Sequence, residues 1–135
     1  MTSPAHPTNR LILLVDDSAT LRMSVRSILE EAGYELVEAS DGVEGLEVLR
    51  ALGRQGRNPA MIISDVNMPR LDGISFIKEI KNTPHKFLPI LVLTTEGQPQ
   101  SKLEGKRAGA SGWLVKPFQP ETLLAVVKKF TRSLN

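Results

Sequence analysis

The stretch LILLVDDS, residues 11–18, decides the fold, because it joins an uninterrupted apolar run to a pair of carboxylates. A continuous apolar run of this length predicts a strand covered on both faces, as the central strands of parallel sheets are. Similar runs follow at MIIS (61–64), ILVL (90–93) and GWLV (112–115), and they also predict central strands. The run ELVEA (35–39) alternates instead and predicts an edge strand.

Helical patterns fill the segments after these strands. Apolar residues of the segment 21–32 recur at the spacing of one buried helix stripe, and Gly33 stands where a left-handed residue would end that helix. Three further segments show the same periodicity, namely 43–49, 74–80 and 120–134.

The segment GQPQSKLEGKRAGA (97–110) has the weakest helical signal. It contains Gly105 and Gly109, each of which costs up to about 1 kcal/mol inside a helix relative to alanine. Five strands, each followed by a helix, predict one α/β domain of the (βα)5 type with a doubly wound parallel sheet. Ligands of such sheets bind at the carboxyl ends of the strands.

The composition is that of one globular domain. The chain has 135 residues, of which 41% are hydrophobic and 24% charged, and this excludes a disordered or collagen-like chain. No apolar run approaches the roughly 20 residues of a membrane-spanning helix. The absence of cysteine excludes disulfides and agrees with a cytoplasmic location. We expect residues 1–9 to form a disordered tail and residues 10–135 to form the domain.

The net charge of +2 is too small to indicate nucleic-acid binding. Basic residues are concentrated in the last third of the chain, where 94–135 contains 7 basic and 3 acidic residues. This concentration fits either a solvated helix face or a surface for an acidic partner, and the sequence leaves both open.

Polar side chains follow four of the five predicted strands. Carboxylates after the first and third strands would converge if those strands are neighbours, and two carboxylates about 4 Å apart repel by roughly 4 kcal/mol at an effective dielectric constant of 20. A cation between them relieves this repulsion, and oxygen ligands favour Mg²⁺ over Zn²⁺. The residues at these strand ends are Asp16, Asp17 and Ser18; Asp65 and Asn67; Thr94 and Glu96; Lys116 and Pro117.

A metal site beside an ammonium group and a hydroxyl group is typical of phosphoryl transfer, which depends on positioning and on charge neutralisation. Lys116 can neutralise an anion beside the metal, and Thr94 can donate to a phosphoryl oxygen. Asp65 is the favoured nucleophile, because it stands alone at the end of its strand and a carboxylate can form an aspartyl phosphate. The pair Asp16 and Asp17 is better placed to hold the metal.

Each of these residues also has a purely structural interpretation. The acidic pair and the serine after it can cap a helix, Asp65 and Asn67 can be ordinary turn residues, and Lys116 can be a surface lysine. The functional interpretation is favoured by the ordered set, in which each member follows a predicted strand. We expect a turn at Pro69 and Gly73 to leave the Asp65 carboxylate accessible.

From about Arg10 to Arg132 the sequence resembles the receiver domain of two-component response regulators, and most closely the single-domain, CheY-like chemotaxis regulators. The motifs LLVDDS, SDVNMPRLDG, LVLTTE and GWLVKPF stand in the family's order. The resemblance implies the strand order 2-1-3-4-5, with Asp65 as phosphoacceptor and Mg²⁺ as cofactor. Asp17 and Asp65 would bind this ion with their carboxylates, Asn67 with its backbone carbonyl and Asp16 through a metal-bound water.

The resemblance also implies how the phosphoryl group is held and sensed. Thr94 and Lys116 would contact it, and the Lys116–Pro117 bond would be cis. Trp113 stands where the family has the tyrosine or phenylalanine that couples to the threonine on activation. Asn67 and Glu96 occupy the positions that tune hydrolysis, and their polar side chains predict a short-lived phosphoryl state.

These residues predict a phosphorylation-dependent switch rather than a classical enzyme, although the chain would catalyse its own phosphorylation and dephosphorylation. A sensor histidine kinase would be the donor, and the fourth helix, fifth strand and fifth helix would bind a protein target. The resemblance suggests the flagellar motor switch as target and a phosphatase as a further partner. Because the sequence ends with the last predicted helix, we expect output by protein–protein contact, without nucleic-acid binding or membrane insertion.

Three alternatives remain open. The first is a phosphorelay intermediate, which uses the same chemistry but passes its phosphoryl group to a second histidine protein. The second is a magnesium phosphatase of the haloacid dehalogenase type, which would need an Asp-x-Asp arrangement after the first strand rather than adjacent aspartates. The third is a flavin-binding module, whose cofactor phosphate the carboxylates after the first strand would repel.

Overall fold

The computed structural model describes residues 9–68, 70–95 and 99–131, and for residues 99–102 it describes the backbone only. Of the expected tail, residues 1–8 lie outside the described residues. Asn9 is placed against the domain, where its side-chain amide donates a hydrogen bond to the carbonyl of Asn58 at 2.7 Å.

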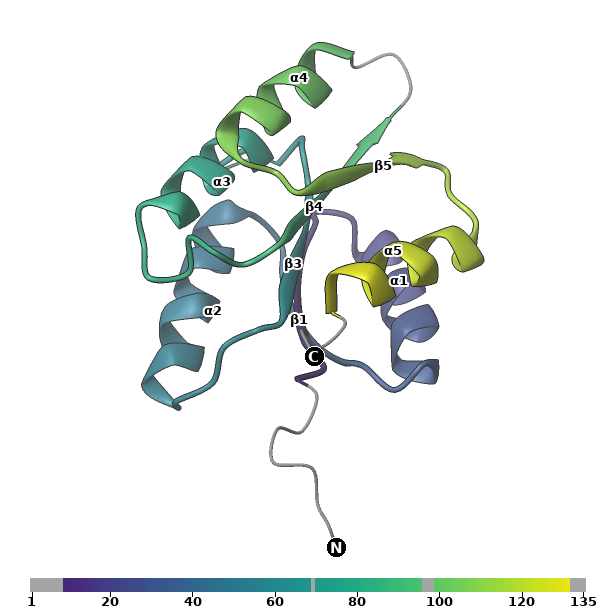
Figure 1. Cartoon of the computed structure of the whole chain (residues 1–135), viewed down its shortest axis with the longest axis horizontal. Helices are drawn as coiled ribbons and strands as arrows, with labels where there is room; N and C mark the ends of the chain where they lie inside the picture. Colours follow the sequence, from purple (N-terminus) through teal and green to yellow (C-terminus); the bar gives the residue numbers. More distant parts are fainter. Residues whose placement is uncertain (1–8, 69, 96–98, 132–135) are drawn as a thin grey trace, which may run out of the picture.

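Five parallel strands form one sheet in the order β2-β1-β3-β4-β5 (Figure 1). This order and the parallel pairing confirm the predicted doubly wound architecture, with β2 at one edge. The strands are β1 (Leu11–Val15), β2 (Glu35–Ala39), β3 (Met61–Asp65), β4 (Ile90–Thr95) and β5 (Gly112–Lys116).

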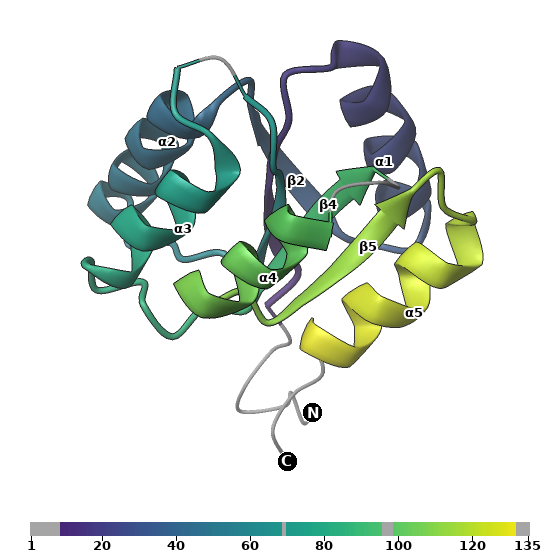
Figure 2. The ribbon, with the colours of Figure 1, turned by 90° about the horizontal axis from the view of Figure 1, so that it is seen from above.

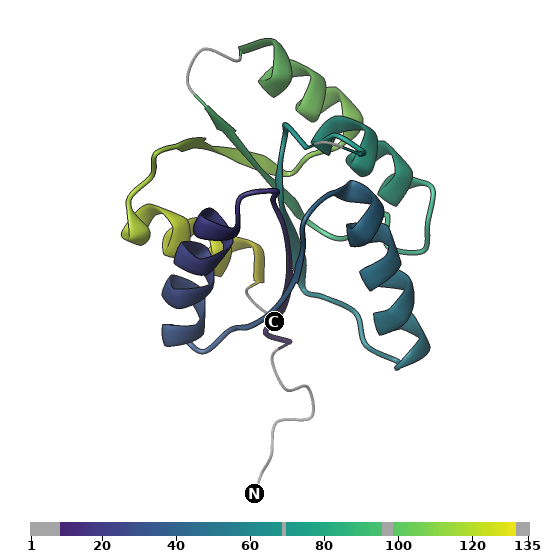
Figure 3. The same ribbon diagram turned by 180° about the vertical axis from the view of Figure 1, so that it is seen from behind.

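Helices cover both faces of the sheet. Figures 2 and 3 show α1 and α5 on one face and α2, α3 and α4 on the other. The helices are α1 (Ala19–Glu31), α2 (Gly42–Arg54), α3 (Gly73–Lys81), α4 (Pro99–Ala108) and α5 (Pro120–Thr131).

Two apolar clusters fill the layers between sheet and helices. On one face, Ile12 and Leu14 of β1 pack with side chains of α1 and α5. On the other face, Leu13 and Val15 pack with side chains of α2 and α3. Both faces of β1 are therefore buried, as its continuous apolar run predicts. Among the helices of the described part of the chain, none combines the length and apolarity needed to span a bilayer.

The central strand that the apolar run at 112–115 predicts is wrong, because β5 forms the second edge of the sheet, as the strand order implied by the resemblance requires. None of its residues is buried, and Val115 is 37% exposed. The strand is apolar nevertheless, because Trp113 and Leu114 pack against the clusters on opposite faces of the sheet. An edge strand whose two faces are both covered therefore has the same hydrophobic pattern as a central strand.

The helix boundaries follow from local chemistry. Ser18 caps α1 by accepting a hydrogen bond from the Leu21 N–H at 3.1 Å, and Gly33 follows the helix with a left-handed φ of 96°. The expected weak helix is α4, which packs against α3, and Gly109 ends it with φ of 114°. Packing on a neighbouring helix therefore compensates for the low helix propensity of α4.

Candidate functional site

The predicted site residues meet at the carboxyl edge of the sheet. Strand β1 lies beside β3 with Val15 opposite Ser64, so that the next residues, Asp16 and Asp65, are level with each other. On the other side of Asp65, β4 and β5 pair with Thr95 opposite Lys116. Parallel pairing therefore brings together side chains that are distant in the sequence.

Three carboxylates form the centre of the site. One oxygen from each of Asp16, Asp17 and Asp65 lies within 4.8 Å of the other two. Asp16 is fully buried and Asp17 is exposed. At such separations each pair of ionised carboxylates repels by roughly 3–4 kcal/mol at an effective dielectric constant of 20.

The expectation of an accessible Asp65 carboxylate is wrong, since only 8% of its side chain is exposed. Its Oδ1 atom accepts hydrogen bonds from the Val66 N–H at 2.9 Å and from the Lys116 ammonium at 3.1 Å. The Lys116 side chain is thus in direct contact with the carboxylate that was expected to be open. Of the turn invoked for accessibility, Pro69 lies outside the described residues.

Lys116 supplies the positive charge of the site. Besides its bond to Asp65, its Nζ lies 3.7 Å from Oδ2 of Asp16, and its side chain is 21% exposed. The Lys116–Pro117 peptide bond is cis. The Lys116 ammonium contacts two of the three clustered carboxylates, so one positive charge is set against three negative charges.

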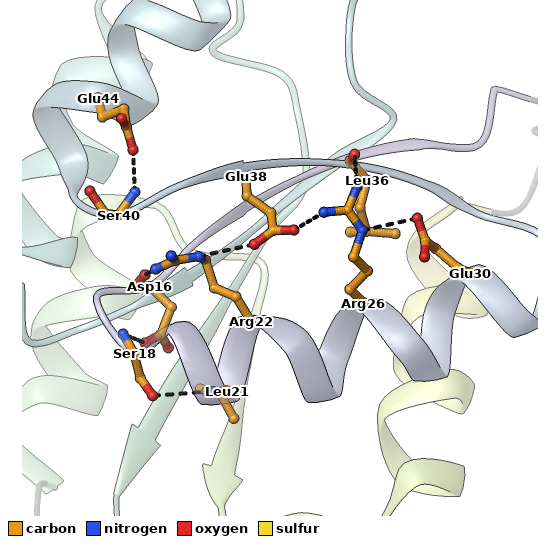
Figure 4. A network of polar contacts seen from close by, with 10 residues as sticks. All are labelled: Asp16, Ser18, Leu21, Arg22, Arg26, Glu30, Leu36, Glu38, Ser40 and Glu44. Atoms are coloured by element: carbon orange, nitrogen blue, oxygen red, sulfur yellow. Dashed lines mark hydrogen bonds and ion pairs between the residues drawn. The ribbon is translucent and has the colours of Figure 1, made fainter.

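Asp16 carries the clearest sign of a missing partner. Its Oδ1 accepts from the Ser18 N–H at 2.8 Å (Figure 4), but among the described side chains its buried Oδ2 has no hydrogen-bond partner. Burial raises the pKa of Asp16; the Ser18 N–H and Lys116 lower this pKa, whereas the charges of Asp65 and Asp17 raise it. A buried carboxylate oxygen without a partner is costly unless another group binds it.

The residues present fit a divalent cation of the magnesium type. The donor set consists of carboxylate oxygens, without histidine or cysteine among the three clustered residues. Mg²⁺ prefers such oxygen ligands and keeps several waters, which the exposed side of Asp17 allows. The orphaned Oδ2 of Asp16 and the surplus negative charge both favour an added cation.

The other predicted residues surround this cluster. Thr94 is buried near the end of β4, and Asn67 is exposed two residues after Asp65. Trp113 is half-buried on β5, two residues before Val115, which lies opposite Thr94. Glu96 lies outside the described residues.

Two contacts hold the neighbouring loops in place, namely the close packing of Gly73 and a salt bridge of Asp41. The sequence analysis named Gly73 only as a turn residue and did not identify the salt bridge. The Gly73 N–H donates to the Val66 carbonyl at 2.8 Å, and a Cβ at Gly73 would lie 2.2 Å from the Asp65 carbonyl oxygen. Asp41 caps α2 and binds Arg70 at 2.7 Å, and the Arg70 hydrogen bond lowers the pKa of Asp41. The backbone at Asp65 is thus packed closely against Gly73, and a residue with a side chain would not fit at position 73.

Replacing Asp16 by asparagine is expected to stabilise the metal-free protein by on the order of 1 kcal/mol, as relief of strain at functional sites commonly does. The substitution keeps the acceptor for Ser18 and removes one of three clustered charges. Because the pKa of Asp16 is raised above 3.8 by folding, its ionisation costs stability as pH rises from that value through the folded-state pKa. The stability gained by Asp16→Asn should therefore be present at pH values above the folded-state pKa of Asp16 and absent at pH values below 3.8.

Urea denaturation in EDTA across this pH range measures the effect. Asp17→Asn is the matched control, since this exposed neighbour loses the same charge without relieving a buried one. An Asp16→Asn variant that is less stable than the wild type at neutral pH would show that the cluster is not strained.

The fold and the site together define a class of protein: a doubly wound α/β domain with an acidic, magnesium-type pocket and a lysine at the carboxyl edge of its sheet. Residues 12–128 match the family described as response regulator receiver domain. The chain belongs to this family, whose members are phosphorylated signalling domains of two-component systems and bind Mg²⁺ at an acidic pocket. Because the chain belongs to this family, the phosphatase and flavin-binding alternatives are no longer supported.

Several known proteins show the same relationship. The chain is 36% identical over 114 residues to the chemotaxis protein CheY1 of Helicobacter pylori, covering 83% of this chain and 89% of that protein. It is 34% identical over 124 residues to the sensor histidine kinase CheAY of the same organism, covering 91% of this chain but only 15% of the kinase.

Solved structures agree with these sequence matches. The chemotaxis response regulator CheY4 of Vibrio cholerae has a TM-score of 0.79 and 47% identity, covering 91% of this chain and 99% of that one. The receiver domain of the sensor histidine kinase PA1611 from Pseudomonas aeruginosa has a TM-score of 0.79 and 26% identity, covering 93% of this chain and 99% of its own. That structure has a magnesium ion coordinated in its active-site cleft.

Proposed function

We propose that Asp65 is the phosphoacceptor of a chemotaxis signalling switch, phosphorylated by a sensor histidine kinase in the presence of Mg²⁺. The observation that supports this best is the contact of Asp65 with the Lys116 ammonium, at 3.1 Å, inside a cluster of three carboxylates. Phosphoryl transfer needs this combination, because the transferred group is anionic and its acceptor is also negatively charged.

Four residues would hold the metal. We assign Asp17 and Asp65 as carboxylate ligands, Asn67 as a ligand through its backbone carbonyl, and Asp16 as a partner through a metal-bound water. When bound, Mg²⁺ neutralises the negative charge that gathers on the phosphoryl oxygens and on the carboxylates.

The protein's own groups carry the transfer. A carboxylate oxygen of Asp65 attacks the phosphorus of the kinase phosphohistidine, and the breaking N–P bond leaves its electron pair on the histidine nitrogen. The Lys116 ammonium then pairs with a phosphoryl oxygen, and the Thr94 hydroxyl donates to another. The Lys116 ammonium, which binds the Asp65 carboxylate before the transfer, thereby binds the phosphoryl group after it.

Hydrolysis returns the switch to its resting state. Water attacks the phosphorus of the aspartyl phosphate, the P–O bond to Asp65 breaks, and the products are the free Asp65 carboxylate and inorganic phosphate. We assign Asn67 and Glu96 as the polar side chains that influence this step. We therefore expect a short-lived phosphoryl state. Persistence of the phosphorylated chain for many hours without a phosphatase would contradict this assignment.

The output would be contact with a protein target through α4, β5 and α5. Leu103 of α4 is 46% exposed, and Val115 of the edge strand β5 is 37% exposed. Basic residues lie near the ends of the two flanking helices: Lys106 and Arg107 of α4, and Lys128 and Lys129 of α5. Exposed apolar side chains together with these basic residues suit an acidic partner surface.

Similarity to CheY4 and CheY1 favours a chemotaxis role, with the flagellar motor switch as target and a phosphatase as further partner. We propose that Thr94 and Trp113 couple the phosphoryl group to the target face. The cysteine-free composition and the family membership favour a cytoplasmic location. The phosphorelay role stays an alternative, which transfer from Asp65 to purified histidine phosphotransfer domains would support.

The only tryptophan of the chain makes the proposal measurable. Addition of Mg²⁺ and then beryllofluoride, a phosphoryl mimic, is expected to change Trp113 emission in two steps. In Asp65→Asn the beryllofluoride step should be absent. Equal responses of the wild type and this variant would argue against Asp65 as the acceptor.

A further inference from the structure

Arg22 stands at an unfavourable position for a basic residue. It lies near the beginning of α1, whose first turn contains no acidic residue, and positive charge there opposes the helix dipole. Its side chain is nevertheless well covered, with 19% exposure. A specific set of contacts compensates for this placement.

Arg22 bridges two elements beside the metal site. Its Nη1 donates to the main-chain carbonyl of Asp16, and its Nε donates to Oε1 of Glu38 on β2 at 3.0 Å (Figure 4). One planar guanidinium group therefore ties the β1–α1 turn to the adjacent edge strand. Such a two-sided contact suits the fixed fork of arginine.

Glu38 is in turn held by a second arginine. Its other oxygen accepts from Arg26, which also binds Glu30 at 3.0 Å and the Leu36 carbonyl at 3.4 Å (Figure 4). The network thus runs along α1 toward Asp16, and of its two arginines it is Arg22 that donates a hydrogen bond to Asp16. Glu38 binds the two arginines through different carboxylate oxygens, so its contact with Arg22 does not require Arg26.

Asp16 is held by three hydrogen bonds, two of them on its main chain and one on its carboxylate. Its N–H donates to the Ala39 carbonyl at 3.1 Å, its carbonyl accepts from Arg22, and its Oδ1 accepts from the Ser18 N–H. These contacts hold Oδ2 within the carboxylate cluster, 3.7 Å from Lys116. Asp17 follows directly, so movement of the Asp16 peptide would displace both carboxylates.

We propose that Arg22 and Glu38 are positioning residues for the magnesium site: Arg22 holds the Asp16 carbonyl, and Glu38 holds Arg22. This inference rests on the proposed Mg²⁺ site. Outer-shell partners of metal ligands typically contribute about 10–100-fold to metal affinity. Arg22 holds the main chain rather than a carboxylate oxygen, so we expect an effect of roughly 10-fold, at the lower end of that range.

Simple electrostatics predicts the opposite sign. A guanidinium group near the site repels a divalent cation, so removal of its charge alone would tighten Mg²⁺ binding. A positioning role predicts weaker binding despite the lost repulsion. The direction of the change therefore separates the two explanations.

The test compares Arg22→Met with Arg26→Met in the full chain. Both variants lose one positive charge from the same network, but Arg26 has no contact with Asp16. Calorimetric titration with Mg²⁺ should show roughly 10-fold weaker binding for Arg22→Met and a change within about twofold for Arg26→Met. Arg22→Lys keeps the positive charge but lacks the planar guanidinium group that makes both hydrogen bonds, so this variant should also bind Mg²⁺ less tightly. It replaces Arg22→Met in the test if that variant does not fold.

Two results would overturn the inference and remain distinguishable. Normal Mg²⁺ binding by the wild type, with equal or tighter binding by Arg22→Met and Arg22→Lys, would overturn the positioning role alone. Absence of Mg²⁺ binding by the wild type would overturn the magnesium site itself, and with it the proposed function.

Discussion

Asp65→Asn is expected to abolish phosphorylation, with no aspartyl phosphate detectable after incubation with acetyl phosphate and Mg²⁺. The carboxamide has nearly the same shape as the carboxylate and can still accept hydrogen bonds from Val66 and Lys116. It lacks the nucleophilic anionic oxygen, so the covalent step has no acceptor. Loss of phosphorylation with retained folding would therefore be a chemical effect. Phosphate-affinity electrophoresis measures it directly.

Asp72→Asn provides a matched control for this experiment. Asp72 is an exposed aspartate just before α3, which it caps by accepting a hydrogen bond from the Ser75 N–H at 2.8 Å. Asparagine caps helices about equally well, so this variant should be phosphorylated like the wild type. Phosphorylation of Asp65→Asn at the wild-type level would instead assign the acceptor to another carboxylate.

Gly73→Ala is expected to destabilise the fold by about 3 kcal/mol, at the upper end of typical overpacking costs. The added Cβ would lie 2.2 Å from the Asp65 carbonyl oxygen and 2.8 Å from the Val66 Cα. Both atoms belong to the backbone, so no side chain can rotate away. The end of β3 would have to move, and with it the proposed phosphoacceptor.

Gly53→Ala tests whether the Gly73 effect comes from this contact. Gly53 lies near the end of α2, and a Cβ there would meet nothing within 4 Å beyond its chain neighbours and the adjacent backbone of its own helix. This substitution should stabilise the protein, by up to about 1 kcal/mol, because alanine is the better helix former. Urea denaturation of both variants gives the comparison, and a Gly73→Ala variant as stable as the wild type would contradict the close packing at Asp65.

The strands could be predicted from the local hydrophobic pattern, and the site from the order of the strands along the chain. Continuous apolar runs identify buried strands, and parallel pairing places their polar ends at one edge of the sheet. The meeting of Asp16, Asp65 and Lys116 therefore follows from the order of the chain once the topology is known.

Other features depend on contacts that no local pattern encodes. The run at 112–115 gave no indication that β5 is an edge strand, because helices cover both of its faces. The burial of Asp65 and its contact with the Lys116 side chain depend on the packing of residues that are distant in the sequence. Arg22 was overlooked, although a basic residue near the beginning of a helix is a signal that could have identified it.

The most direct measurement locates the phosphoryl group itself. Borohydride reduces an aspartyl phosphate to homoserine, so the full-length chain can be phosphorylated with acetyl phosphate and Mg²⁺, reduced, digested and sequenced by mass spectrometry. We expect homoserine at position 65 and unmodified aspartate at positions 16, 17 and 72. Homoserine at any of these other positions, with aspartate retained at 65, would contradict the account of the site.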